Sequence, residues 1–129
     1  MGDDAGAHGL SRADRLLHAM ARDGARCVWC RCELSARFGR PTLEHVVPKV
    51  KGGPAWPENE VAACGRCNRT RGHLAPDAWL RVCEVERGLT PDRGAIVGSL
   101  RRLDAAIAAR GGQRRARPYV ARQLQRLSG

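Results

Sequence analysis

The sequence predicts an α+β fold, in which a short β-hairpin and a helix form a small core with flanking α-helices around it. Two observations support this prediction. A loop rich in proline and glycine separates two short segments of strand-like composition. The residues before and after this region place apolar side chains at helical spacing. A chain of 129 residues is expected to form one domain of this kind.

The first part of the chain predicts a tail, a helix and a strand. Residues 1–10 are small, polar and glycine-containing, so a disordered tail is expected there. Ser11 fits an N-cap with Asp14 in capping-box position, which predicts a helix over 12–22. A short strand is expected over 41–47.

The central part of the chain predicts an irregular loop followed by a return strand. Proline and glycine residues interrupt 48–60 repeatedly, so neither helix nor strand is expected over this range. A long irregular loop in a small domain is usually functional or disordered. The return strand is expected over 59–62, and a helix over about 68–72.

Three more helices are expected in the last part of the chain. One begins at Pro76-Asp77 and stops at Gly88, and a second begins at Thr90-Pro91-Asp92 and extends to Gly111. The last covers about 118–127. The fold divides on this basis into a disordered tail over 1–10, a central domain over 11–88 and a basic helical extension over 89–129.

Four cysteines form two CxxC pairs, which are Cys27 with Cys30 and Cys64 with Cys67. The first 26 residues contain no apolar run, so neither a signal peptide nor a membrane helix is expected, and the location is predicted as cytoplasmic. Thiols then stay reduced, and paired CxxC motifs indicate a structural Zn²⁺ site with four thiolate ligands. The alternative is two unrelated pairs of buried thiols.

Two further cysteines lie outside these pairs. Cys32 follows the first pair too closely to join it comfortably, and we treat it as a spare thiol that could instead replace Cys30. Cys83 falls among apolar helix positions, where a packing role is expected.

The charge of the chain favours a nucleic-acid partner. The net charge is +10, and 21 of the 23 basic residues are arginines. Arginine has a rigid fork that fits phosphate oxygens, so a domain of this composition suggests binding to a polyanion. Bias toward GC-rich codons could explain the preference for arginine, but it does not explain the excess of positive charge.

One central stretch resembles a known family. EHVVPKVKGG over 44–53, then Asn59, then CGRCNRTRG over 64–72, looks like the motif of the HNH endonucleases, also called ββα-metal or His-Me finger nucleases. The resemblance covers about 27–72. Glu44 stands where aspartate is commoner, and Asn68 stands where the last histidine of the motif would be, so this is an HNN variant.

The resemblance implies a metal-dependent endonuclease that hydrolyses DNA phosphodiester bonds and nicks one strand per active site. His45 is then the general base, since a neutral imidazole can accept a proton from water near neutral pH. Glu44 and Asn68 would hold a catalytic Mg²⁺ or Mn²⁺ through oxygen atoms. Asn59 would orient the His45 ring or brace the loop.

The geometry of a strand restricts this site. Successive side chains of a strand face opposite ways, so only one of Glu44 and His45 can point straight at a given target. A strand end or bend at this place would let both residues reach one site. Taken alone, each part of the motif also has an ordinary interpretation. Glu44 and His45 would be an exposed pair, Asn59 a turn residue and Asn68 the start of a helix.

Several basic residues are candidates for binding nucleic acid, with DNA favoured over RNA and no membrane partner expected. They are Lys49, Lys51, Arg69, Arg71, Arg114, Arg115 and Arg117. A solvated basic face is the alternative for these residues. His73 could be an additional ligand or a phosphate contact, although a surface or C-cap role is favoured.

Two other functions compete with the endonuclease. The first is a zinc-stabilised nucleic-acid-binding module without catalytic activity, and the second is a structural zinc protein of a larger assembly. The joint presence of Glu44, His45, Asn59 and Asn68 argues against both, because neither function requires all four.

Overall fold

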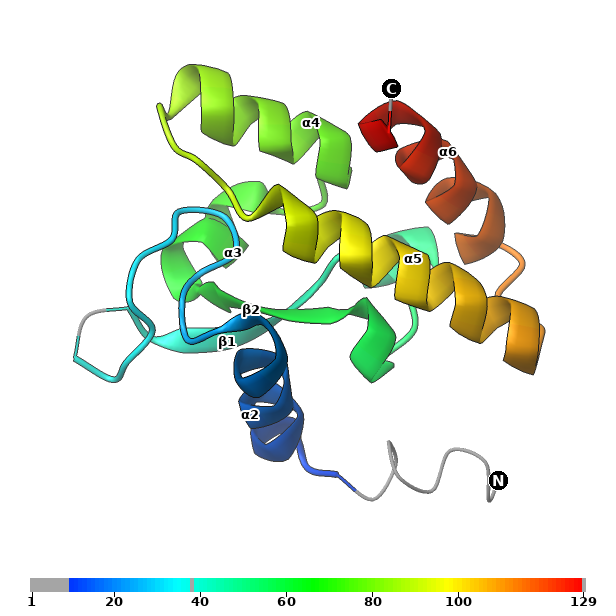
Figure 1. Ribbon diagram of the computed structural model, residues 1–129, viewed down its shortest axis with the longest axis horizontal. Coiled ribbons are helices and arrows are strands. Elements are labelled where there is room, and N and C mark those ends of the chain that lie inside the picture. Colours follow the sequence, from blue (N-terminus) through cyan, green and yellow to red (C-terminus); the bar gives the residue numbers. More distant parts are fainter. Residues whose placement is uncertain (1–9, 38, 129) are drawn as a thin grey trace.

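The computed structural model describes residues 10–37 and 39–128, so the tail predicted over 1–10 lies almost entirely outside the described residues. Two strands and five α-helices follow one another along this part of the chain (Figure 1). They are α2 (Arg12–Asp23), β1 (Pro41–His45), β2 (Glu60–Cys64), α3 (Gly65–Arg71), α4 (Pro76–Arg81), α5 (Arg93–Arg110) and α6 (Ala116–Ser128). The predicted α+β class is confirmed.

The helices begin where local chemistry satisfies their free N–H groups. Ser11 caps α2 by accepting a hydrogen bond from the Asp14 N–H, and the Asp14 side chain accepts from the Ser11 N–H. This is the predicted capping box. Asp92 rather than Thr90 caps α5, because its carboxylate reaches the Ala95 N–H.

The predicted loop and the helix after α3 differ from the structure in detail. The region 48–60 contains two single turns of 3-10 helix, Lys49–Lys51 and Pro57–Asn59. The helix expected from Pro76 to Gly88 begins as α4 and continues as a π-helix over Val82–Glu86. Short turns of this kind satisfy backbone groups without a long apolar face, so composition alone does not reveal them.

The strands β1 and β2 form an antiparallel hairpin. Its register pairs Pro41 with Cys64 at one end and His45 with Glu60 at the other. Residues directly opposite one another point to the same side of a sheet, so this register places His45 and Glu60 side by side.

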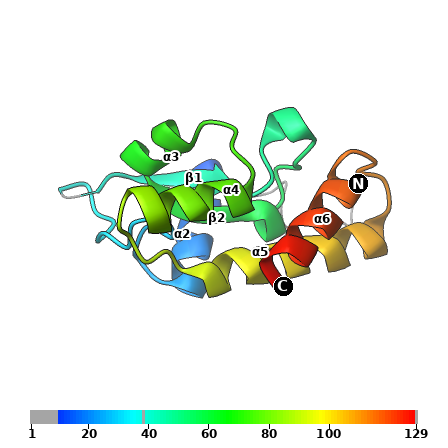
Figure 2. The same ribbon diagram turned by 90° about the horizontal axis from the view of Figure 1, so that it is seen from above.

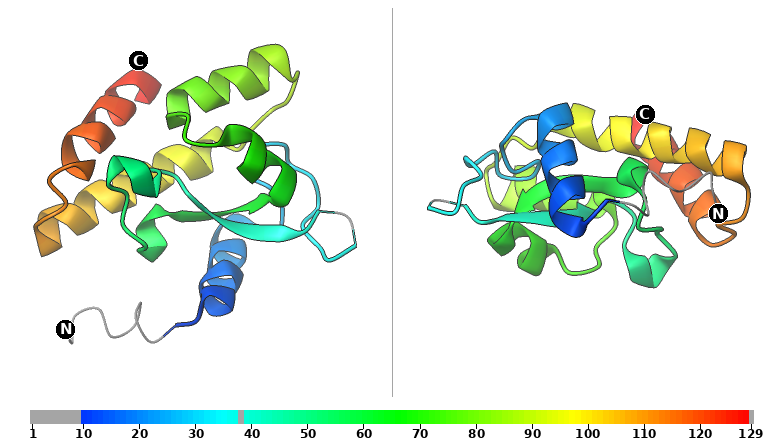
Figure 3. Two further views of the ribbon diagram at one scale, coloured as in Figure 1. Left: turned by 180° about the vertical axis from the view of Figure 1, so that it is seen from behind. Right: turned by 90° about the horizontal axis from the view of Figure 1, so that it is seen from below.

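Helices cover both faces of the hairpin. Figure 2 shows α3 on one side of the strands and α5 on the other. Helix α2 packs mainly on β2, and α3 contacts both strands. Figure 3 shows from behind and from below how α5 runs along the hairpin. Helix α6 packs against α5 and α4.

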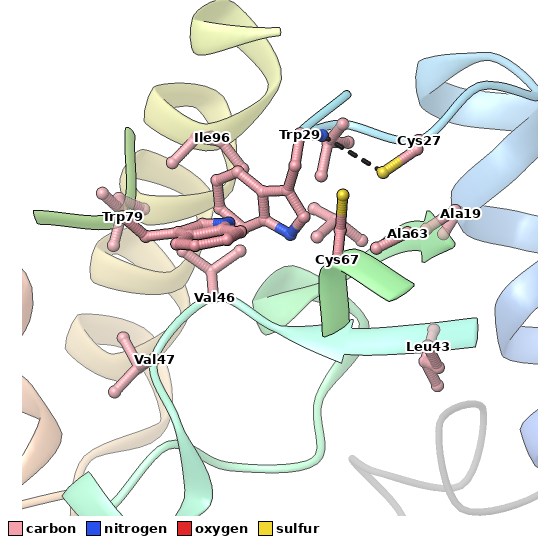
Figure 4. Packing of buried hydrophobic residues seen from close by; sticks show 14 of the residues in the cluster. Ala19, Cys27, Trp29, Leu43, Val46, Val47, Ala63, Cys67, Trp79 and Ile96 are labelled. Atoms are coloured by element: carbon pink, nitrogen blue, oxygen red, sulfur yellow. Dashed lines mark hydrogen bonds between the residues drawn. The ribbon is translucent and has the colours of Figure 1, made fainter. Parts of the chain in front are cut away.

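Two tryptophans form the centre of the hydrophobic core. The rings of Trp29 and Trp79 pack edge to face with their centroids 6.3 Å apart, and both residues are buried. Figure 4 shows them beside Val46 and Ile96. Because Ile96 belongs to α5, the basic extension predicted over 89–129 shares one core with the hairpin. No helix of the described ranges is long and apolar enough to cross a membrane.

Candidate functional site

The structure brings the four predicted cysteines together at the Cys64 end of the hairpin. The sulfurs of Cys27, Cys30, Cys64 and Cys67 all lie within 4.8 Å of one another, and Cys30 Sγ lies 3.9 Å from Cys64 Sγ. Tetrahedral thiolate coordination at a metal–sulfur distance of about 2.3 Å requires sulfurs roughly 3.8 Å apart. These residues can therefore hold a metal ion, and Cys30 rather than Cys32 belongs to the group.

The pKa values of two thiols in this cluster depend on each other. A hydrogen bond from Cys67 lowers the pKa of the Cys27 thiol, and the same contact raises the pKa of Cys67. The pair thus shares a proton, and ionisation of all four sulfurs needs positive charge among them. Arg87 supplies part of that charge from outside, with its Nη atoms 3.4 and 3.5 Å from Cys67 Sγ.

A separate hollow of about 290 Å³ lies at the His45 end of the hairpin. Its lining includes most of the predicted reactive residues and several basic groups. They are Arg12, Leu43, Glu44, His45, Pro48, Lys49, Asn68, Gly72 and His73. Within the described ranges, the cysteine group alone combines three or more metal-binding His, Cys, Asp or Glu side chains.

His45 is the last residue of β1 and is held from the side of α2. Its Nε2 atom lies 3.4 Å from Glu60 Oε2, outside the geometry of a good hydrogen bond, and Glu60 also pairs with Arg15 of α2 at 3.1 Å. Burial raises the pKa of the Glu60 carboxyl, but His45 and Arg15 outweigh this effect and hold the pKa below its ordinary value. Glu60 is therefore an anion beside the imidazole.

Glu44 lines the hollow, and its side chain also contacts residues of the protein interior. Its Oε2 atom accepts a 2.9 Å hydrogen bond from the Trp29 indole and lies 3.5 Å from Arg71 Nη1. Burial raises the pKa of the Glu44 carboxyl, and the two partners offset this rise only in part. A metal ion in the hollow would have to bind Glu44 through its other oxygen.

Asn59 lies away from the hollow and braces the loop. The residue is fully buried, and its side-chain amide accepts from the Val47 N–H at 2.8 Å and donates to the Val47 and Pro54 carbonyls at 3.0 Å. Of the two roles considered for Asn59, these contacts correspond to loop bracing, because none of them involves the His45 ring. Gly53 makes the approach possible, since a Cβ there would lie 2.9 Å from Asn59 Nδ2.

Asn68 lies on α3 and lines the hollow together with His45. Its Nδ2 donates a 3.0 Å hydrogen bond to Thr42 Oγ1, and Thr42 donates in turn to the Ala63 carbonyl at 2.8 Å. This chain holds the amide so that its oxygen remains an acceptor for a ligand.

Arg71 does not fit the predicted role of a phosphate contact. The residue is only 2% exposed, and its guanidinium donates to the carbonyls of His45, Val46 and Leu74 at 2.6 to 3.0 Å. Its charge is opposed by Glu44. The prediction was wrong because helix position alone did not reveal that this side chain turns inward.

The other predicted basic residues are exposed. Lys49 lines the hollow, whereas Arg69 lies on the outer side of α3 near the cysteine group. Arg115 donates through Nη2 to the Val50 carbonyl and so touches the loop between the strands. Lys51, Arg114 and Arg117 are exposed as well, and His73 is exposed at the rim of the hollow.

Some residues of the site carry no signal in the motif. Glu60 and Thr42 contact the predicted reactive residues, and only the hairpin register could have suggested the first of them. Trp29 joins the first CxxC pair to Glu44 through its indole. Antiparallel pairing of the predicted strand with its return strand, in the correct register, would have placed Glu60 opposite His45.

Known proteins resemble the part of the chain that carries this site. Residues 27–82 match the sequence model of the HNH endonucleases. The matched range contains both cysteine pairs and the hollow-lining residues from Leu43 to His73.

Two similar proteins are Cas9 enzymes. A stretch of 78 residues is 30% identical to the CRISPR-associated endonuclease Cas9 of Corynebacterium diphtheriae. This stretch covers 59% of this chain and 7% of that protein. The crystal structure of the type II-C Cas9 enzyme from Actinomyces naeslundii matches the whole chain with a TM-score of 0.54 and 23% identity. The match covers 13% of that enzyme and establishes the fold.

Proposed function

We propose that this chain is an HNH nuclease that hydrolyses DNA phosphodiester bonds with the help of a divalent metal ion, cutting one strand at each visit. The observation that carries the proposal is the position of His45, at the end of β1 and in one hollow with Asn68 and Glu44. The endonuclease names of the Cas9 relatives support the reaction class.

His45 acts as the general base in this proposal. A proton on Nε2, which lies 3.4 Å from the Glu60 carboxylate, leaves the lone pair of Nδ1 to accept a proton from water. The imidazolium formed in this step is stabilised by the same anion, which is itself compensated by Arg15. Glu60 is thus a positioning residue for His45, and Asn59 and Arg71 hold the backbone at His45 and just after it.

Glu44 and Asn68 would hold the catalytic Mg²⁺ or Mn²⁺. Both residues line the hollow, and a carboxylate and an amide oxygen are ligands that these hard cations accept. Such an ion, when bound, would polarise the phosphate and stabilise the charge of the leaving oxygen. The sparse donor set leaves positions for water and substrate.

Zn²⁺ is the proposed occupant of the cysteine group, with a structural role. Four thiolates complete a tetrahedral shell and leave no position for water. We assign the chemistry to 11–88, where both sites lie, and a bracing role to 89–129. Ser99 of α5 supports the second role, because its hydroxyl donates to the Glu58 carbonyl at 2.7 Å.

Plasmid nicking tests the proposal directly. Purified protein is incubated with supercoiled plasmid and Mg²⁺, Mn²⁺ or no added metal, beside His45→Ala. We expect metal-dependent nicking that falls at least about 100-fold in the variant, since a general base contributes about 10² to 10⁴ in rate. His18→Ala, which changes an exposed histidine of α2, is the matched control and should cut like the parent protein.

Two results would contradict the proposal. Equal nicking by His45→Ala and the parent protein would exclude His45 as the base. Tight DNA binding without cleavage under any metal condition would instead support a zinc-stabilised binding module. Zinc content, measured on each protein, must be unchanged for either result to count.

A further inference from the structure

A second cavity among the described residues lies outside the reactive hollow. Its volume is about 970 Å³, and it opens beside the cysteine group between α2, α3 and the residues before β1. Among the residues that the structure describes, five arginines line it and no acidic residue does. They are Arg12, Arg40, Arg66, Arg69 and Arg87.

Four of these arginines are available for a ligand. Arg87 is directed toward Cys67, but Arg12, Arg40, Arg66 and Arg69 are all exposed. Within 10–37 and 39–128, none of the four lies within 4.0 Å of a carboxylate. Such a concentration of uncompensated positive charge attracts a polyanion.

The arginines come from separate parts of the chain. Arg12 begins α2, Arg40 precedes β1, and Arg66 and Arg69 lie on α3. Gly65 leaves room for one of them, since a Cβ there would lie 3.0 Å from Arg69 Nη1. The fold therefore assembles the positive surface, and no run of basic residues in the sequence indicates it.

The cavity adjoins the reactive hollow. Arg12 and Leu43 line both spaces, and Arg12 Nη2 lies 3.4 Å from the Leu43 carbonyl on the boundary between them. Helix α3 also borders both, with Asn68 in the hollow and Arg66 in the cavity. A polymer that places one phosphate at His45 can therefore continue past Arg12 toward Arg66.

We propose that this cavity, the arginine groove, binds the sugar-phosphate backbone of a single DNA strand on one side of the scissile bond. The proposal rests on the proposed function, because the polyanion is identified by its path from the reactive hollow. A cavity of this volume receives a segment of one strand and not a duplex. Among the described residues, the lining includes apolar side chains but no aromatic ring, so we expect binding to follow phosphate positions and not base identity.

Salt dependence of binding is the test. Fluorescence anisotropy is measured with a labelled single-stranded oligonucleotide at several salt concentrations, without Mg²⁺ or Mn²⁺. The variant Arg40→Gln/Arg66→Gln removes two groove charges, and Arg81→Gln/Arg101→Gln removes two exposed charges elsewhere. Each lost phosphate contact lowers the slope of log K against log salt by about 0.7 for a single strand.

We expect the slope to fall by about 1.4 in the groove variant and to stay near the parent value in the matched control. An equal change in both variants, or none in the groove variant, would overturn the proposal. So would a loss confined to duplex DNA. Displacement of the strand by polyglutamate at equal charge would assign the groove to acidic peptides instead.

The same proteins in the nicking assay separate this proposal from the proposed function. His45-dependent nicking with unchanged slopes would reject the arginine groove alone. If the salt-dependence slopes fall as expected but the protein cuts no DNA, the arginine groove is supported and the proposed nuclease function is rejected. Zinc content and thermal melting of Arg40→Gln/Arg66→Gln show that any effect comes from the groove and not from unfolding.

Discussion

The two ends of the β1–β2 hairpin are held by different means. At the Cys64 end, four sulfurs from two short CxxC turns lie within 4.8 Å of one another. At the His45 end, the supports come from distant parts of the chain and include Asn59, Arg71 and Glu60. One end is closed by ligands that can complete a metal shell, and the other surrounds an open hollow.

This difference separates rigidity from reactivity. A thiolate shell that is complete stabilises the fold but offers no place for substrate. Partly buried hydrogen bonds at the other end hold His45 and Asn68 while leaving them accessible from the hollow. Trp29 connects the ends, since it follows Cys27 in the first turn and donates to Glu44. The following changes test whether the ends can be altered separately.

Cys27→Ser should have the largest effect. Removing one of four ligands should release the metal and unfold the domain, because binding of structural zinc supplies about 10–16 kcal/mol in small domains, as much as their total stability. Metal analysis and circular dichroism measure this. Cys32→Ser, outside the group, should keep the metal. Retention of one metal per chain by Cys27→Ser would show that the group was assigned incorrectly.

Arg71→Met should destabilise the protein by about 3–5 kcal/mol, because it leaves Glu44 as a buried charge and the His45 and Val46 carbonyls without these donors. Urea denaturation measures the free energy of unfolding. The zinc content should not change below the unfolding transition. Arg69→Met on the exposed side of α3 is the control, with an expected change under about 0.5 kcal/mol. Similar values for both variants would mean that Arg71 is not a support of the His45 end.

Glu60→Gln should lower nicking about tenfold and change the response to acid. The pKa of Glu60 is lowered in the folded protein, so its contribution to stability is present above the ordinary glutamate pKa and is lost as pH falls through the folded value. Unfolding measured between pH 7 and pH 3 should therefore be less pH-dependent in the variant. Glu86→Gln, an exposed control, should follow the parent curve.

Arg115→Ala should have the smallest effect, about 1 kcal/mol or less in stability, since it removes one exposed hydrogen bond to Val50. A bracing role predicts slightly slower nicking with unchanged DNA affinity. A phosphate contact, as the charge pattern suggested, predicts weaker DNA binding with unchanged stability. Anisotropy and thermal melting of the same sample distinguish the two roles.

The sequence alone was enough for the features that depend on neighbours in the chain. The capping box of Ser11 and Asp14 formed as predicted, and the two CxxC turns present their sulfurs because a tight turn brings residues three apart together. The order of strands, loop and helix around His45 also followed from local patterns. Boundaries shifted by a few residues, as at α5, where several capping side chains compete.

Tertiary structure decided what each side chain touches. Arg71 and Arg69 are two residues apart in one helix. Arg71 is buried and donates to the His45 carbonyl at the end of β1, whereas Arg69 lies open to a cavity. Glu60 lies beside His45 because of the hairpin register, and the arginine groove gathers charges from three separate segments. Spacing along the chain determines local turns, but burial and charge pairing depend on which elements pack together, and only the folded chain establishes that.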